Sequence, residues 1–424
     1  MRTSNISRTT AVGSAFLLSL LPLDATATPS ISIDSVIQRW PWNNKIDITY
    51  TISGDGGQDI ANFNYCKVVF TATIPGRAEP VVIDGSSDVI AKAENGTWTV
   101  TWTNAPAGVK ADNCTMVASL YRTTGDYMVV DLDTGAYAFD DLADGDTPTA
   151  TPAASNARYN TPLYKTDRMV FRRVPRTADA AAAYAGGYPT GHADFSAPTY
   201  TGSYTNSVTT WTTDKDYFVG VFEVTVAQAA KLGQSWGSWK SEQTTGGLDP
   251  NLCPADKIMW NTLRETNTGN DFFPKLKSKT GLTGFMLPTE VMWEIAARAG
   301  ATTVYPWGDT MDTTYCHCNY TPLYPITVGS RKSNAWGLFD MIGNVSEYTH
   351  DNSGALGDLA DRSSAWQRLD STNVNGNWYW MCRGGYFNMA KTHDSLKASC
   401  RVKSAVNWEQ RDSKIGFRVS YIPQ

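Results

Sequence analysis

Residues 383–401 read RGGYFNMAKTHDSLKASCR and place several metal-binding residue types in or beside one short stretch. Soft sulfur and imidazole ligands suit copper(I), and four residues here are of that kind: Cys382, Met389, His393 and Cys400. The simpler interpretation is structural, with the methionine in the core, the histidine on the surface and the two cysteines in a bridge. The sequence favours this structural interpretation and keeps copper as the alternative.

A shorter candidate is the tripeptide Cys316-His317-Cys318. Thiolates and imidazoles bind zinc, but a structural zinc site needs four ligands, and no second closely spaced pair of cysteines or histidines completes the set. We therefore predict that the tripeptide is an extended segment that contributes half of a disulfide. The sequence also carries no local signature of a Ser-His-Asp triad.

The first residues of the chain predict export. Arg2 and Arg8 precede the apolar stretch AVGSAFLLSLLPL, and Ala25-Thr26-Ala27 then offers the small residues of a cleavage site. We interpret residues 1–27 as a signal peptide cleaved near Ala27, which places the mature protein in a secreted, periplasmic or cell-surface location. An uncleaved membrane anchor is the alternative. No other segment reaches about 18 apolar residues, so we expect no stable membrane insertion.

The composition is that of a globular protein with enough apolar residues for two cores. The 424 residues are 42% hydrophobic and 18% charged, which excludes a disordered chain. The net charge is only -5 and no basic run is present, so nothing indicates binding to nucleic acid.

Export permits disulfides, and Cys66 and Cys114 are the only cysteines in the first third, so we predict that they pair. The connectivity of the other five cysteines stays open.

Residues 29–145 are predicted to form an all-β, immunoglobulin-like sandwich. Short alternating runs such as KIDITYTI, CKVVFTATI and GTWTVTW are separated by Gly, Pro and Asn-Gly turn signals. Two opposed sheets would bury four tryptophans around the predicted bridge: Trp40, Trp42, Trp98 and Trp102. This part carries no catalytic cluster, so we interpret it as a spacer or adhesion module, with carbohydrate binding as the alternative.

A linker separates this domain from a second one. Residues 146–164 are poor in large apolar side chains and rich in Pro, Thr and Ala, a composition that builds no core of its own. Within residues 165–424, capping residues predict two helices, one beginning after Thr225 with Gln228 in a capping box and one beginning after Thr289. The long polar connections around these helices need specific contacts to order them.

Six motifs of the second domain occur in the order typical of one family: DYFVGVFEVTVAQ, GFMLPTEVMWEIAARAG, YPWGD, NAWGLFDMIGNVSEYTHD, RGGYF and GFRVSY. Together they resemble the formylglycine-generating enzymes, also called sulfatase-modifying factors, over residues 165–424. The resemblance implies an α+β variant of the C-type lectin fold, with little regular structure, small twisted sheets and two helices.

The resemblance also implies a calcium site. Asn344 and Glu347 are similar to calcium ligands of the family, and amide, carboxylate and backbone oxygens suit a hard cation. In the alternative, the Asn344 side chain forms hydrogen bonds within its own turn, and Glu347 forms an ion pair with an arginine such as Arg383 or Arg418.

The copper thiols of the family are not matched. Its oxidising members carry two cysteines shortly after Arg-Gly-Gly, and these hold copper(I) in a geometry open to oxygen. Counted from the Gly-Gly pair, the first position falls at Asn388 or Met389 and the second near His393 or Asp394, so neither is a thiol. The related iron-dependent sulfoxide synthases use a His-x-x-x-His-x-Glu motif, which the four histidines do not form.

A third group that shares this fold consists of secreted or phage-borne binding proteins. The stretch after Gly-Gly mixes aromatic and small polar residues, a composition typical of binding surfaces on rigid scaffolds. We therefore predict a non-catalytic protein that binds a protein, a small molecule or a glycan through Tyr386, Asn388, Lys391, His393 and Trp408. The alternatives are a metal-dependent oxidoreductase that acts on a thiol substrate at a relocated metal site, and a purely structural surface component.

Overall fold

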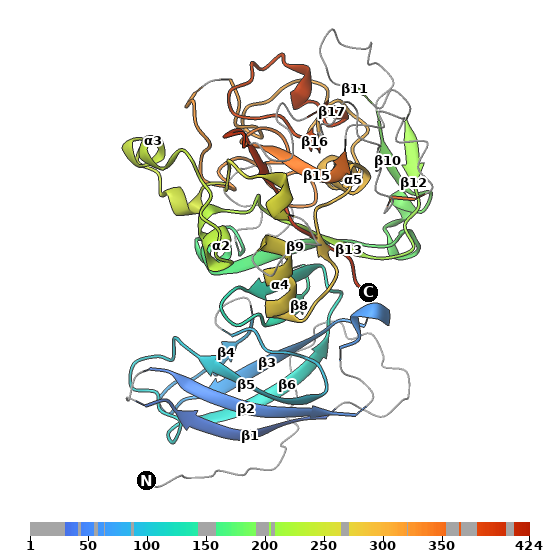
Figure 1. Ribbon diagram of the computed structural model, residues 1–424. Coiled ribbons are helices and arrows are strands. Elements are labelled where there is room, and N and C mark those ends of the chain that lie inside the picture. The colour runs from blue at the N-terminus through green and yellow to red at the C-terminus, as the bar shows by residue number, and fades with distance from the viewer. Residues whose placement is uncertain are drawn as a thin grey trace. The chain divides into compact units, whose positions relative to one another are not determined.

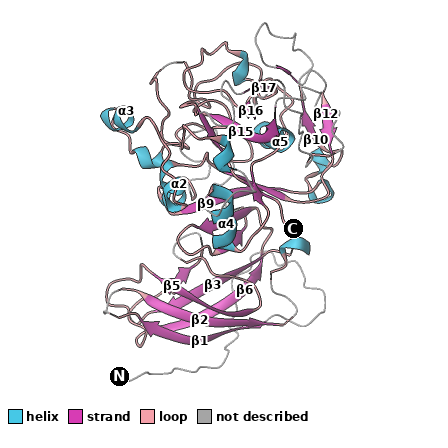
Figure 2. Ribbon diagram, viewed as in Figure 1, coloured by secondary structure: helices cyan, strands magenta, loops and turns pink. Residues whose placement is uncertain are grey.

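The computed structural model describes residues 30–40, 44–54, 58–62, 64–85, 89–142, 158–191, 203–204, 208–263, 271–319, 321–352, 364–365, 380–403 and 411–424. The chain divides into two compact units, the first formed by residues up to 131 together with 136–141 and the second by 132–135 and 142–424 (Figure 1). Both consist mainly of strands and loops, with few and short helices (Figure 2). The predicted signal peptide lies outside the described residues, and within them no helix has the length and apolar character needed to cross a membrane.

The first unit contains two antiparallel sheets of three strands each. Their orders are β1-β2-β5 and β4-β3-β6, and a hairpin of β7 and β8 follows. The bounds are β1 Ser30–Gln38, β2 Ile46–Ser53, η1 Ile60–Asn62, β3 Cys66–Thr73, β4 Val81–Ile83, β5 Gly96–Trp102, β6 Thr115–Arg122, β7 Tyr127–Asp131 and β8 Tyr137–Asp140. Every second residue of β2 and of β3 is buried, as expected for strands with one face on a core.

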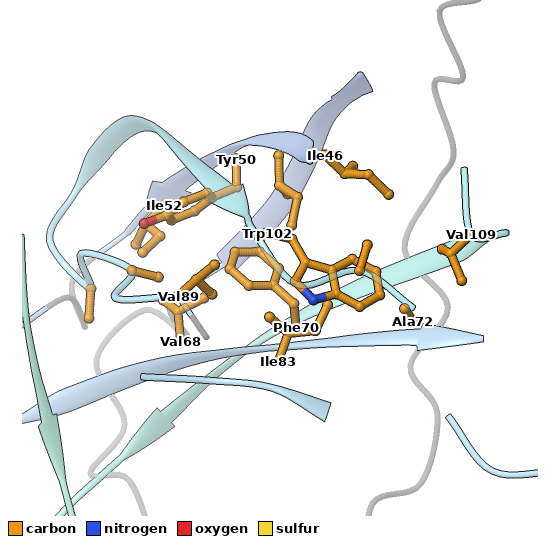
Figure 3. Packing of buried hydrophobic residues seen from close by; sticks show 14 of the residues in the cluster. Ile46, Tyr50, Ile52, Val68, Phe70, Ala72, Ile83, Val89, Trp102 and Val109 are labelled. Carbon is orange, nitrogen blue, oxygen red and sulfur yellow. The ribbon is translucent and has the colours of Figure 1, made fainter. Parts of the chain in front are cut away.

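The two sheets share one hydrophobic core (Figure 3). Ile46 and Tyr50 from β2 meet Val68 and Phe70 from β3, and the rings of Tyr50 and Phe70 form an edge-to-face pair with centroids 5.3 Å apart. Trp102 of β5 is only 2% exposed and closes the same core. The predicted burial of this tryptophan is therefore confirmed, and the immunoglobulin-like connectivity stays a prediction.

The predicted Cys66–Cys114 disulfide is wrong. Cys66 begins β3 opposite Arg122, whereas Cys114 immediately precedes Thr115, which lies opposite Thr73 at the other end of the strand pair. At about 3.3 Å per residue the two cysteines are roughly 25 Å apart, while a disulfide needs Cα atoms within about 7 Å. The alternating sequence pattern identifies both strands but not their register.

The tryptophans of this unit do not all enter the core. Trp40 is 73% exposed, contrary to the prediction, and Trp42 lies outside the described residues. Trp98 is half-buried at the edge of the core, where its Nε1 donates a hydrogen bond to the carbonyl of Glu94 at 2.9 Å.

The second unit contains three small groups of strands joined by long loops. Strands β14, β19, β13 and β9 lie side by side in that order, β11-β17-β16-β15-β18 form a five-stranded sheet, and β10 pairs with β12. The strand bounds are β9 Arg168–Val174, β10 Tyr188–Thr190, β11 Ser203–Tyr204, β12 Thr209–Trp211, β13 Tyr217–Gly220, β14 Phe285–Met286, β15 Ser346–Asn352, β16 Trp380–Arg383, β17 Cys400–Lys403, β18 Ile415–Phe417 and β19 Ser420–Tyr421.

The helices of the second unit are short. The α-helices are α1 Leu163–Thr166, α2 Val226–Lys231, α3 Lys240–Thr245, α4 Phe272–Thr280 and α5 Glu290–Arg298. The 3-10 turns are η2 Thr177–Asp179, η3 Ala182–Tyr184, η4 Pro250–Leu252, η5 Trp260–Leu263 and η7 Asp394–Leu396.

Both predicted helix caps are confirmed. The Thr225 hydroxyl accepts from the Gln228 amide at 3.1 Å while the Gln228 side chain accepts from the Thr225 amide at 3.1 Å, which is a complete capping box. The Thr289 hydroxyl accepts from the Met292 amide at 3.2 Å at the start of α5. Every residue of α5 is buried, so this helix lies inside the unit rather than on its surface.

The predicted linker is only partly described. Residues 146–157 lie outside the described residues, whereas Tyr159 and Tyr164 are buried in the second unit, with their rings edge to face at 5.0 Å. The ordered packing of the second unit therefore begins before residue 165.

Candidate functional site

The Arg-Gly-Gly step at the end of β16 turns the chain into the loop that carries most of the predicted contacts. Gly384 and Gly385 have φ values of 88° and 69°. A Cβ atom on Gly384 would lie 2.8 Å from the carbonyl oxygen of Met341, and one on Gly385 would lie 2.8 Å from the side chain of Leu396. Both the left-handed backbone and the lack of space require glycine here.

The loop that follows, residues 386–397, alternates between inward and outward side chains at its start. Phe387 and Met389 are buried, Tyr386 and Asn388 are half-buried, and Lys391 is exposed. Three of the predicted contact residues therefore reach the surface on a segment whose intervening side chains belong to the core. This arrangement suits a binding loop, because the anchored side chains limit the conformations of the outward ones.

Backbone hydrogen bonds attach the 386–397 loop to the rest of the unit. The Phe387 amide donates to the carbonyl of Asn344 at 2.9 Å, and the Asn319 amide donates to the carbonyl of Met389 at 2.7 Å. The Phe387 ring also packs edge to face against Trp239 with centroids 5.6 Å apart. Segments from three other parts of the sequence thus contact the loop.

The remaining predicted contacts differ in their surroundings. His393 is half-buried, and its Nδ1 accepts from the Ser395 amide at 3.1 Å, so this histidine caps the turn η7. The Lys414 ammonium lies 5.1 Å from the ring centre of Tyr386. Trp408 lies outside the described residues. The structure therefore brings Tyr386, Asn388, Lys391 and His393 together on one loop.

A buried ion-pair network supports the loop from β16 and α5. Arg383 donates from Nε to Glu290 at 3.0 Å and from Nη1 to Glu294 at 3.2 Å, and Glu294 also accepts from Arg298 at 2.8 Å. Burial alone would raise the pKa of Glu294, but Arg298 and Arg383 reverse the effect and hold its pKa below the usual value. Two arginines and two carboxylates thus offset one another inside the unit, and their ion pairs fix the point where the loop begins.

The two predicted calcium ligands are committed to protein partners. Asn344 accepts from the Ile326 amide at 2.9 Å and donates to Glu223 at 2.6 Å. Both carboxylate oxygens of Glu347 accept from Arg418, at distances of 2.7 to 3.2 Å, and one also accepts from the Trp293 indole at 2.7 Å. The pair does not fit a calcium site, because the oxygens that would bind the ion already face cationic or N–H donors.

Further buried charges surround this ion pair. Burial, followed by repulsion from Asp340 and Glu347, raises the pKa of Glu223 well above its usual value. Burial raises the pKa of Asp340 as well, and burial lowers the pKa of Lys165 to about 8 although Asp340 opposes that shift. Arg418 and Lys165 are the cations that oppose these shifts of the two carboxyl groups.

A comparison with known families identifies the second unit. Residues 184–421, more than half of the 424-residue chain, match the family of the sulfatase-modifying factor enzyme 1-like domain. The chain belongs to this family. The sulfatase-modifying factor domain has the C-type lectin-like fold expected for residues 165–424, so the resemblance based on the six motifs is confirmed.

Curated relatives match parts of the chain only. Serine/threonine-protein kinase pkn1 of Chlamydia pneumoniae is 41% identical over 139 residues, and formylglycine-generating enzyme of Mycobacterium tuberculosis is 40% identical over 80 residues. These matches cover 32% and 16% of this chain, but only 20% and 27% of the relatives.

Two solved structures are similar over 60% of this chain. Treponema denticola variable protein 1 is matched over 96% of its length at 20% identity with a TM-score of 0.46. PvdO from Pseudomonas aeruginosa is matched over 94% of its length at 17% identity with a TM-score of 0.44.

The positions expected from the sequence to hold the copper thiols, 388 or 389 and 393 or 394, carry no cysteine in this domain. Met389 is buried as a core residue, and His393 uses Nδ1 to cap η7. Cys382 lies opposite Val402 in the β16–β17 register, and burial raises the pKa of its thiol well above the usual value. Among the described residues, no group of three or more His, Cys, Asp or Glu side chains is arranged to hold a metal ion.

The sequence did not reveal that Cys316 and Cys318 lie beneath the 386–397 loop. The hydrogen bond between Asn319 and Met389 ties the segment after the tripeptide to this loop, and the ring of His317 stacks on Phe387 with centroids 6.4 Å apart. The only available signal was the i, i+2 spacing, which places two side chains on the same side of an extended segment. It gives no information on the loop above them.

Proposed function

We propose that the protein is a non-catalytic binding protein that uses the 386–397 loop of its sulfatase-modifying factor domain to contact a protein, a small molecule or a glycan. Tyr386, Asn388 and Lys391 make the direct contacts, and His393 holds the loop in shape through its cap. Trp408 is retained as a contact from the sequence prediction.

One observation carries this proposal. The positions that hold the copper thiols in oxidising relatives fall, in this chain, on residues of a firmly anchored loop, at or next to the buried Met389 and the capping His393. The outward residues of the same loop include an aromatic ring, an amide and an ammonium group, which supply contact area, hydrogen bonds and charge. The site retains the supports of a functional loop without the groups needed for thiol oxidation.

The proposal includes export and a spacer role for the first unit. The signal-peptide pattern of residues 1–27 supports a secreted, periplasmic or cell-surface location. The two-sheet first unit, with the threonine-rich faces of β2 and β5, is proposed to hold the binding domain away from its attachment point. Calcium at Asn344 and Glu347 is not part of the proposal, because both side chains are engaged by protein donors.

The first test separates binding from thiol oxidation. The mature protein, loaded with copper(I), is incubated with a cysteine-containing peptide while oxygen consumption and loss of the peptide thiol are measured. We expect neither above the level of free copper. Copper-dependent turnover that saturates with peptide would overturn the proposal in favour of a metal-dependent oxidoreductase with a relocated site.

The second test locates the binding surface. The protein is applied to a glycan array and to a phage-displayed peptide library, and each positive ligand is measured again with the Tyr386→Ala and Lys391→Ala variants. Loss of a central aromatic or charged contact weakens binding by roughly tenfold or more. The matched control is Lys240→Ala, which removes an exposed lysine from α3. Equal affinity of all variants would show that the ligand binds elsewhere.

A further inference from the structure

Cys316 and Cys318 form a close pair of thiols. An isolated β-bridge between His317 and Gly343 keeps the tripeptide extended, so the two cysteines project to the same side. Both are free thiols, and their mutual interaction, with Cys316 as the donor, shifts the pKa values of the two sulfurs in opposite directions. The predicted half-disulfide with a distant cysteine is therefore not the observed arrangement.

Charged side chains from two other segments act on this pair. The hydrogen bond from Cys316 lowers the pKa of Cys318, and the positive charges of Lys391 and Arg331 act in the same direction against the effect of burial. The pKa of Cys316 is raised well above its usual value, first by the same hydrogen bond and then by burial. Of the two thiols, Cys318 is thus the one that ionises more readily, and Cys316 is the one that holds its proton more tightly.

Access to the pair is narrow. Cys316 is 1% exposed and Cys318 is 5% exposed. A Cβ atom on Gly343 would lie only 2.7 Å from the sulfur of Cys316, so this side of the pair is closed by backbone. On the other side, Lys391 of the 386–397 loop is exposed, and its ammonium group is near enough to influence Cys318. Only a small reagent can reach the sulfur without unfolding the segment.

From this geometry we infer that Cys316 and Cys318 form a site for oxidation by hydrogen peroxide, with Cys318 as the attacking sulfur and Cys316 as the resolving one. Lys391 belongs both to the binding loop and to the surroundings of this pair, but the inference does not depend on the proposed binding function.

The reaction takes two steps. The Cys318 thiolate attacks one oxygen of the peroxide, so that an S–O bond forms, the O–O bond breaks, and the departing hydroxide takes a proton to become water. The sulfur of Cys316 then attacks the sulfenic sulfur of Cys318, an S–S bond forms, and the S–O bond breaks. The released hydroxide combines with the proton of Cys316 to give a second water. Overall, two thiols lose two electrons and one peroxide becomes two waters.

Cys253 and Cys382 of the second unit lack this combination. Burial raises the pKa of Cys253 to about 12 and raises the pKa of Cys382 well above its usual value. A buried thiol that stays protonated reacts slowly, because the thiolate is the nucleophile. These two cysteines are therefore internal controls for the pair.

The tryptic map of the chain makes the test direct. Cleavage after Arg298 and Arg331 releases residues 299–331, which contain Cys316 and Cys318 and no other cysteine, while residues 241–257 and 369–383 carry Cys253 and Cys382 singly. The reduced protein is exposed to hydrogen peroxide, and remaining thiols are alkylated before unfolding and digestion. We expect peptide 299–331 to become lighter by about 2 Da, through loss of two hydrogens, roughly tenfold faster than either control peptide is oxidised.

Variants assign the roles of the two sulfurs. In Cys316→Ser the resolving thiol is missing, so dimedone should label a sulfenic acid at Cys318, whereas Cys318→Ser should give no label at Cys316. Lys391→Met should slow oxidation of the wild-type pair several-fold, because it removes a positive charge near the thiolate. This exposed substitution keeps the test valid if a serine variant does not fold.

Three results would overturn the inference. The first is equal oxidation rates for all three peptides. The second is labelling of Cys316 rather than Cys318 by dimedone. The third is a purified protein whose Cys316–Cys318 peptide is already oxidised and resists dithiothreitol, which would make the pair a structural disulfide.

Discussion

The most informative stability test is removal of the buried guanidinium of Arg418. This group donates to both carboxylate oxygens of Glu347 and also to the backbone carbonyls of Gly220, Val221 and Phe339, the last at 2.8 Å. One side chain therefore neutralises a buried charge and satisfies carbonyl groups from two separate segments. Arg418→Met keeps much of the volume and the apolar stem but removes every one of these bonds.

The expected cost follows from the bonds that are lost. Breaking a buried ion pair by removing one partner costs about 3–5 kcal/mol. Each buried acceptor left without a donor adds roughly 1 kcal/mol or more. Val221 keeps the Phe339 amide as a donor, so the carbonyls of Gly220 and Phe339 are the ones affected. We therefore expect Arg418→Met to lower the free energy of unfolding by about 5–7 kcal/mol, a large part of the roughly 5–15 kcal/mol typical of folded proteins. Arg418→Lys keeps the positive charge but loses the planar guanidinium group and some of its N–H donors, so it should cost about half as much free energy of unfolding.

Urea unfolding followed by tryptophan fluorescence measures these differences, since Trp293 donates directly to Glu347. Adding Glu347→Gln to Arg418→Met removes the uncompensated carboxylate and keeps an acceptor for the indole. The double variant should therefore be about 2 kcal/mol more stable than the sum of the two single effects predicts. A cost below about 1 kcal/mol for Arg418→Met, or strictly additive effects, would refute the view that this ion pair stabilises the domain.

Three further predictions concern local features. Thr225→Ala removes both the α2 cap and a buried hydroxyl and should cost about 1–2 kcal/mol by urea unfolding, whereas the exposed Thr244→Ala should be close to neutral. Gly384→Ala places a side chain 2.8 Å from a backbone carbonyl at positive φ and should lower Tm markedly, whereas Gly186→Ala, with open space around the new Cβ, should not. Burial raises the pKa of Asp256 to about 6, so the folded state holds a proton that the unfolded state releases near pH 4, and stability should fall as pH rises from about 4 to 6. Asp256→Asn should remove that part of the dependence of Tm on pH, and an unchanged profile would assign the proton to another group.

The features that the sequence predicted correctly depend on neighbouring residues. The caps at Thr225 and Thr289 each join groups three residues apart, so local spacing is sufficient to identify them. The family motifs likewise depend on short stretches, including glycines whose positive φ values leave little choice of residue. Such patterns identify the elements and the family fold.

The features that were missed depend on contacts between distant residues. Glu347 pairs with Arg418, which is 71 positions away in the sequence. The residue type of Glu347 and its spacing from Asn344 could therefore not distinguish an ion pair from a calcium ligand. The pairing of Cys66 failed because strand register is set by the whole sheet rather than by the cysteines. The surroundings of Cys318 include Lys391, which the sequence places in a different motif.

The last strands of the domain have a consequence for how it folds. β18 pairs in parallel with β15, while β19 lies between β13 and β14, so residues 415–421 complete two different groups of strands. A growing chain that has not yet reached these residues leaves the edges of β13, β14 and β15 without their final partners. Pairings between residues this far apart in sequence are slow to form and leave strand edges exposed to other chains. The domain can therefore finish folding only after residues 415–421 have been synthesised. Until then its strand edges are exposed, and this is when protection by chaperones matters most.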